Sequence, residues 1–213
     1  MKHLGYMIAC FITLLNANLV KAQDDVKIGT QVWTSKNLDV STFRNGEAIP
    51  EAKNAEEWVK AGENKQPAWC YYDNNVQNGK NYGKLYNWYA VNDSRGLAPK
   101  GYHIPSDADW TILINFLGGM DKAGYKMKSK SDWQKNVFKS GNGNNSSGFN
   151  GLPGGTCHGG YAGGIGELVS WWSSNTGFLS GTSCGLSNLD AFVQRYPSGY
   201  GEGAGLSVRC LRD

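Results

Sequence analysis

The stretch Phe149–Ser174, FNGLPGGTCHGGYAGGIGELVSWWSS, combines eight glycines and one proline with two adjacent tryptophans and a single charged residue. Glycine inside a helix costs about 1 kcal/mol relative to alanine, so we do not expect the stretch to be helical. Its many large apolar side chains argue against a disordered linker. Aromatic residues mixed with glycines are typical of tight turns in a packed region where backbone segments approach closely. We interpret this stretch as the irregular, packed centre of an extracellular domain.

The composition of the whole chain agrees with this interpretation. Its 213 residues include 29 glycines, about twice the usual share, together with eight tryptophans and eleven tyrosines. A single domain over residues 23–213 is long enough to bury a sizeable core. Abundant glycine and aromatic residues favour short strands, turns and long ordered loops over a helical bundle.

Residues 1–22 have the features of a signal peptide. Lys2 and His3 precede an apolar run, Met7–Leu15, that is too short to span a bilayer, and Val20-Lys21-Ala22 fits a cleavage site. We therefore expect cleavage after Ala22 and a secreted, periplasmic or cell-surface protein. Loss of this segment lowers the formal charge from +3 to +1, which makes nucleic acids and anionic membranes poor candidates as partners.

The clearest helix signal lies at residues 104–117. Ser106 is a candidate N-cap, and Asp109 stands three residues later as in a capping box. Apolar residues then recur at helical spacing, which predicts a buried face, and a glycine pair ends the helix.

Other elements are predicted from alternation, caps and turn residues. They are a hairpin beginning at Val26, a short helix over residues 54–61 with Trp58 in the core, a strand over 66–73, a polar loop over 74–83, an aromatic helix over 85–91, a weak helix over 121–126, and strands over 191–196 and 206–211.

No motif for catalysis or metal binding is convincing. Residues 181–185 match the pattern G-x-S-x-G around Ser183, but all three histidines precede that serine, whereas the nucleophile-elbow fold places its histidine after it. Cys157 and His158 are adjacent, and adjacent side chains of an extended chain point to opposite sides. A single acid beside two asparagines, at residues 73–75, is too few ligands for calcium. We therefore expect no catalytic residue, metal or cofactor.

Aromatic residues are more numerous than one core requires. Exposed tryptophan and tyrosine beside polar residues bind sugars by stacking, or bind other proteins. We expect two or three of these rings at the surface.

Four cysteines remain after the signal peptide: Cys70, Cys157, Cys184 and Cys210. An even number in an exported chain favours two disulfides, for which three pairings exist.

Six motifs, in order, identify a family resemblance. They are PAWCYYDNN, YGKLYNWYAV, LAPKGYHIPSDADW, FNGLPGG, WWSSN and GLSVRCLRD, between residues 67 and 213. Over roughly residues 27–213 the chain resembles the Fibrobacter succinogenes major paralogous domain, which is found in exported and surface proteins of Bacteroidetes and Fibrobacteres. Two motifs also resemble the C-type-lectin-like fold of formylglycine-generating enzymes.

The resemblance implies an α+β, C-type-lectin-like domain with two main short helices, small twisted antiparallel sheets and long glycine-rich ordered loops. It also implies the disulfides Cys70–Cys210 and Cys157–Cys184, because the family's cysteines correspond to the first pair. It supplies no catalytic residue, and the calcium-binding tripeptides of true C-type lectins are missing.

These observations favour an exported, non-enzymatic binding module for a surface polysaccharide or a protein ligand at the cell envelope. The expected ligand surface comprises Tyr161, Trp171, Trp172, His158 and Tyr200, centred on an exposed insert at residues 156–168. The alternatives are a structural subunit of a surface assembly and a hydrolase that uses scattered carboxylates or Cys157 and His158.

Overall fold

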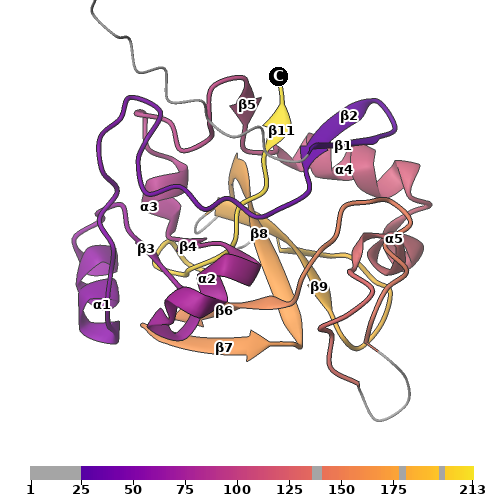
Figure 1. Ribbon diagram of the computed structural model, residues 1–213. Helices are drawn as coiled ribbons and strands as arrows, with labels where there is room; N and C mark the ends of the chain where they lie inside the picture. The colour runs from indigo at the N-terminus through magenta and orange to yellow at the C-terminus, as the bar shows by residue number, and fades with distance from the viewer. Residues whose placement is uncertain (1–24, 136–140, 178–180, 197–199) are drawn as a thin grey trace, which may run out of the picture.

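The computed structural model describes residues 25–135, 141–177, 181–196 and 200–213, so the expected signal peptide lies outside the described residues. Within them, helices and strands are mixed in an α+β fold, as the sequence predicted (Figure 1). The helices are α1 (Ala55–Glu63), α2 (Val76–Tyr82), α3 (Trp88–Val91), α4 (Asp107–Phe116) and α5 (Met120–Met127), with a 3-10 turn η1 (Tyr72–Asn74). In Figure 1, α1 and α5 lie on opposite sides of the long strands β8 and β9.

A four-stranded sheet joins the beginning of the described chain to its end. Its order is β1-β2-β11-β5, and every pairing is antiparallel. The strands are β1 (Asp25–Ile28), β2 (Gln31–Thr34), β5 (Tyr102–His103) and β11 (Leu211–Arg212). The predicted hairpin is confirmed as β1–β2, and Gly29 provides the positive φ of 61° that its turn requires.

A five-stranded sheet in the order β10-β9-β8-β6-β7 contains most of the glycine-rich stretch. The strands are β6 (Gly154–His158), β7 (Tyr161–Ile165), β8 (Leu168–Thr176), β9 (Gly181–Ser187) and β10 (Gln194–Tyr196). The expectation of long loops here is therefore wrong. Glycine is required in these strands because neighbouring backbone and aromatic rings occupy the space that a larger side chain would need. For example, a Cβ on Gly181 would lie 2.1 Å from the Trp88 ring.

Two helix predictions from capping signals are confirmed. Ser106 and Asp109 form the reciprocal capping box at the start of α4, and the side chain of Asn54 accepts a hydrogen bond from the Glu57 N–H at the start of α1. Trp58 is buried, as predicted, and the weak helix at 121–126 is observed as α5.

The aromatic region between residues 66 and 91 differs from its prediction. The expected strand and aromatic helix shrink to a two-stranded sheet of β3 (Trp69–Cys70) and β4 (Leu85–Tyr86), followed by α3. The expected polar loop contains η1 and α2, and the described residues hold five α-helices instead of two main ones. The loop prediction failed because Asn75 caps α2 with its side chain, and because Gly79 gives the Tyr71 ring room against the helix.

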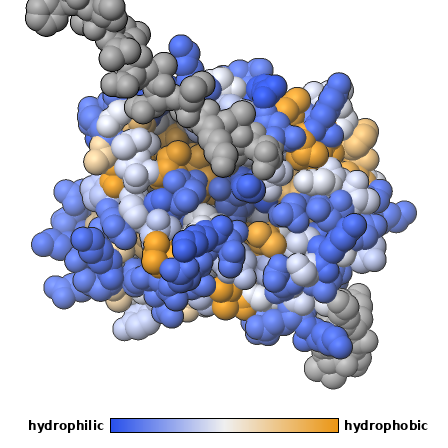
Figure 2. Space-filling view, in the orientation of Figure 1, coloured by the Kyte–Doolittle hydropathy of each residue, from blue (hydrophilic) through white to orange (hydrophobic). Residues whose placement is uncertain are grey.

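One of the two main core clusters is built around aromatic rings. Trp33 lies 4.7 Å from Trp110 between ring centroids, and Phe149 lies 5.3 Å from Trp171 in an edge-to-face contact. Trp172 packs on Trp88 in a neighbouring cluster. By contrast, the face of the molecule in Figure 2 is mostly hydrophilic, with apolar residues in small separate patches.

One charged side chain, Arg209, is buried at the centre of this packing. Its guanidinium donates hydrogen bonds to the carbonyl oxygens of Thr34 and Phe149, both at 2.7 Å, and of Asn150 at 3.1 Å. Its Nε donates to Oδ1 of Asn37 at 2.8 Å. Arg209 thus ties β2 to the start of the glycine-rich stretch, a role that no sequence signal indicated.

Candidate functional site

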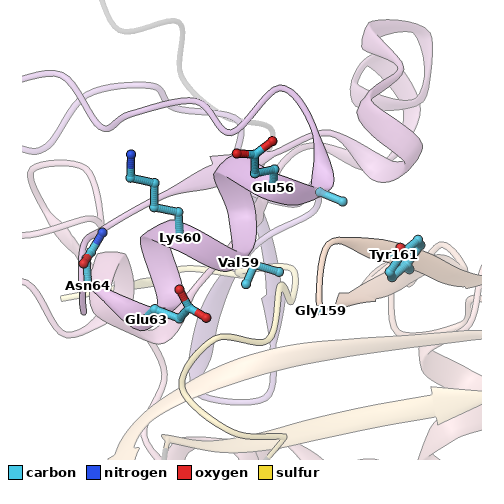
Figure 3. A pocket seen from close by; sticks show the side chains of 8 residues that line it. Glu56, Val59, Lys60, Glu63, Asn64, Gly159 and Tyr161 are labelled. Carbon is cyan, nitrogen blue, oxygen red and sulfur yellow. The ribbon is translucent and has the colours of Figure 1, made fainter.

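A groove of about 780 Å³ lies between α1 and the hairpin that joins β6 to β7. Figure 3 shows Val59 and Glu63 projecting from α1 toward the hairpin, which carries Gly159 and Tyr161. The lining residues are Ala55, Glu56, Val59, Lys60, Glu63, Asn64, Gly159 and Tyr161. Two carboxylates, one ammonium, one amide and one phenol thus surround the groove.

The orientation of α1 follows from its single tryptophan. Trp58 is buried, and its Nε1 donates a hydrogen bond to the carbonyl oxygen of Gly203 at 2.8 Å, which fixes the rotation of the helix. Side chains on the opposite faces, including Glu56, Lys60 and Glu63, are exposed. The groove therefore has a rigid wall that presents hydrogen-bonding groups to solvent.

The hairpin wall is held close to α1 by glycines. Gly159 and Gly160 have φ values of 56° and 83°, which make the tight turn between β6 and β7. A Cβ on Gly160 would lie 2.5 Å from Cα of Ala55, so only glycine permits this approach to the helix. Tyr161 follows the turn with 77% of its surface exposed, and its ring stands free beside the groove.

A second pocket of about 280 Å³ shares Val59, Glu63 and Gly159 with the groove. Its floor is Trp58, and its wall is formed by His158 and Tyr200, whose ring centroids lie 5.0 Å apart. The Tyr200 hydroxyl also lies 3.1 Å from Oγ of Ser170. Desolvation of the imidazole lowers the pKa of His158, which favours a neutral ring at pH 7.

Three of the five expected ligand residues come together here. Tyr161 borders the groove, and His158 and Tyr200 border the adjoining pocket.

The prediction that Trp171 and Trp172 belong to the ligand surface is wrong, because both side chains are completely buried. The Nε1 of Trp171 donates to Oδ1 of Asn37 at 2.8 Å, and the Nε1 of Trp172 donates to the carbonyl oxygen of Tyr86 at 2.7 Å. Strand alternation could not separate core from surface here, because β8 is covered on both faces at these positions.

The expected disulfide pairings are also wrong. All four cysteines are buried as free thiols. Cys210 belongs to the core cluster of Trp172, and Cys184 belongs to the cluster of Trp171, whereas Cys70 and Cys157 share a third, smaller cluster. Cys157 does not hold the insert to the strand of Cys184, because it packs in the same cluster as Cys70 of β3, whereas Cys184 packs in another cluster.

The alternative catalytic groups do not converge. Ser183 is buried within β9, with 1% of its surface exposed. Cys157 is buried while its neighbour His158 is exposed, so the two side chains point to opposite sides of β6, as predicted. Among the described residues, no three histidine, cysteine or acidic side chains are grouped as a metal site would need.

The charged wall formed by Glu56, Lys60 and Glu63 was missed by sequence reasoning. The available signal was the spacing of these residues around Trp58: once the tryptophan is placed in the core, the charged face of the helix must border solvent. The sequence did not indicate that the β6–β7 hairpin would lie opposite this face.

No helix in the described part of the chain is long and apolar enough to cross a membrane.

Searches of curated proteins and of solved structures gave no match. The profile of the Fibrobacter succinogenes major domain matches residues 26–212, nearly the whole chain. The chain therefore belongs to the Fibrobacter succinogenes major domain family.

Proposed function

We propose that the protein is an exported, non-enzymatic binding module that holds a polysaccharide chain in the groove between α1 and the β6–β7 hairpin. The observation that carries the proposal is the exposed ring of Tyr161 beside a groove lined by carboxylate, amide and ammonium groups. Sugars present CH faces that stack on aromatic rings and hydroxyl groups that hydrogen-bond to such polar side chains.

The shape of the site supports a chain-like ligand. The groove continues into the smaller pocket through Val59, Glu63 and Gly159, and the paired rings of His158 and Tyr200 stand at its far end. A sugar unit stacked on Tyr161 would leave the next unit within reach of that second aromatic wall. The site is open to solvent on one side, as binding to the middle of a polymer requires.

Two further parts of the proposal concern the chain as a whole. We propose a C-type-lectin-like fold, supported by the pairing of β2 with β11, which brings the first and last parts of the domain into one sheet. Export to the cell envelope is supported by the signal-peptide features of residues 1–22. N-terminal sequencing of the secreted protein should begin at Gln23.

The test is a glycan array and a pull-down on bacterial surface polysaccharides, followed by titration of the best ligand. Tyr161→Ala should weaken binding between about twofold and tenfold, the range expected for loss of one aromatic contact. Tyr125→Ala is the matched control, because Tyr125 is also an exposed tyrosine, at 49%, but belongs to α5 on the opposite side of the molecule. The control should bind like the original protein.

Two outcomes would overturn the proposal: blank results in both the array and the pull-down, or equal affinities of the two tyrosine variants. Hydrolysis of a bound polysaccharide would instead favour the glycosidase alternative. The groove offers Glu56 and Glu63 as its carboxylates, but both are exposed, whereas a glycosidase places its acid in an apolar environment.

A further inference from the structure

Two cysteines that are distant in sequence meet beneath the groove. Cys70 ends β3 and Cys157 lies in β6, and both are buried in one small cluster. The other buried members of this cluster are Ala52, Trp58, Ala68 and Leu85. Each thiol also shifts the pKa of the other, as expected for side chains that lie next to each other in this cluster.

The backbone on both sides of this contact is fixed by pairing. Cys70 lies opposite Leu85 in the β3–β4 ladder. Cys157 exchanges two backbone hydrogen bonds with Gly205, of 2.9 and 2.8 Å, and a Cβ on Gly205 would lie 2.9 Å from both Cβ of Cys157 and the Trp58 ring. The contact between the two cysteines therefore arises from a tight, well-determined part of the core.

The remaining two cysteines have different surroundings. Cys184 faces Trp171 across the β8–β9 ladder, and the N–H of Cys210 donates to the hydroxyl of Thr34. Burial raises the pKa of each of these thiols to about 12. They are isolated from each other and from the pair, and we expect them to stay reduced.

We propose that Cys70 and Cys157 are a disulfide-forming pair that covalently joins β3 to β6 beneath the groove when the protein meets a disulfide oxidant. In the first step, the thiolate of one cysteine attacks a sulfur of the oxidant and displaces one thiol from it. In the second step, the other cysteine attacks the mixed disulfide and displaces the second thiol. Two protein thiols become one disulfide, the oxidant disulfide becomes two thiols, and the two protons pass to those leaving groups.

Cys157 is the better first nucleophile. The hydrogen bond from Cys70 lowers the pKa of Cys157, whereas the same interaction together with burial raises the pKa of Cys70. The chain on the C-terminal side of Cys157 also borders the second pocket through His158 and Gly159.

The experiment uses the full chain in two arms, one native and one refolded from denaturant, each with oxidised glutathione. Remaining thiols are alkylated after unfolding, and a non-reducing peptide map identifies the linked peptides. We expect two thiols to be lost per chain, one Cys70–Cys157 link, and intact thiols at Cys184 and Cys210. Because the bond closes a loop of about 90 residues, the oxidised protein should melt about 5 to 15 °C above the reduced protein.

Matched double variants separate this pair from the other two cysteines. Cys184→Ser/Cys210→Ser should still lose two thiols, whereas Cys70→Ser/Cys157→Ser should lose none. The peptide map of the unmodified chain keeps the test valid if either variant fails to fold.

A link formed only in the refolding arm supports the proposal, since burial then limits access to the native pair. Four intact thiols in both arms, or a link through Cys184 or Cys210, would overturn it. Neither result depends on whether the groove binds a polysaccharide.

Discussion

Replacement of Arg209 by methionine probes the structure most directly, because Arg209 is a buried cation whose hydrogen-bond partners are mainly backbone carbonyl groups. Three of these acceptors, on Thr34, Phe149 and Asn150, belong to two segments that are far apart in sequence. A fourth, Oδ1 of Asn37, also accepts from Trp171 and so keeps one donor after the change. Methionine has a similar length but offers no donor, so the three carbonyl groups lose the hydrogen bonds from the guanidinium.

Two opposing effects determine how much the free energy of unfolding decreases in Arg209→Met. Each buried carbonyl left without its donor costs about 1–3 kcal/mol. Against this, removal of the guanidinium relieves the cost of keeping a charge away from water, a cost that is visible as a lowering of the pKa of Arg209 to about 9. The three unpaired carbonyl groups together cost roughly 3–9 kcal/mol, and the relief of the buried charge offsets part of this, which leaves a net cost of about 3–5 kcal/mol. We therefore expect a loss of that size, which is a large fraction of the 5–15 kcal/mol typical of a domain.

Urea unfolding followed by tryptophan fluorescence gives the free energy, and a thermal melt should show a decrease of roughly 6–20 °C. Arg209→Lys keeps the charge but loses the planar fork, so it should also be destabilised. Arg212→Met is the matched control: the guanidinium of Arg212 is exposed and its ion pair with Asp25 is screened by solvent, so its loss should change stability far less. If Arg209→Met were within 1 kcal/mol of this control, the buried guanidinium would not hold these segments together.

Two other predictions follow from the β6–β7 region. Gly155→Ala should lower the free energy of unfolding by about 3 kcal/mol, because Gly155 has a φ of 69° and a Cβ there would lie 2.4 Å from the Tyr72 ring. Gly163→Ala is the control, because no atom lies within 4 Å of a Cβ at that position. Its free energy of unfolding, measured in urea, should change by less than about 0.5 kcal/mol. The lowered pKa of His158 means that the unfolded chain binds more protons as the pH falls below 6.5, so stability should decrease there. In thermal melts between about pH 7 and pH 5, the His158→Asn variant should lose less stability than the original protein. An equal loss in the two proteins would contradict a lowered pKa of His158.

Local signals predicted the elements whose determinants lie within a few residues. The reciprocal bonds of Ser106 and Asp109, the Asn54 cap and the Gly29 turn are all observed. The loop prediction over residues 74–83 failed because asparagine and glycine were taken as loop formers, whereas Asn75 acts as a cap and Gly79 makes room for Tyr71. Local composition cannot show what a glycine lies against.

The candidate site was predictable only in part. Tyr161, His158 and Tyr200 were expected at the surface and border the groove and its adjoining pocket. Trp171 and Trp172 were placed with them because they lie in the same stretch, but β8 passes through the middle of the core and buries both rings.

The sequence by itself determined the α+β class, the family, and the beginnings of the main helices, since caps, turns and motifs are properties of neighbouring residues. The tertiary structure alone decided that the glycine-rich stretch forms strands, that Arg209 lies among carbonyl groups, and that Cys70 meets Cys157. These results depend on contacts between residues that are dozens of positions apart. Such contacts are fixed by how strands and rings fill the core, and no local pattern records them.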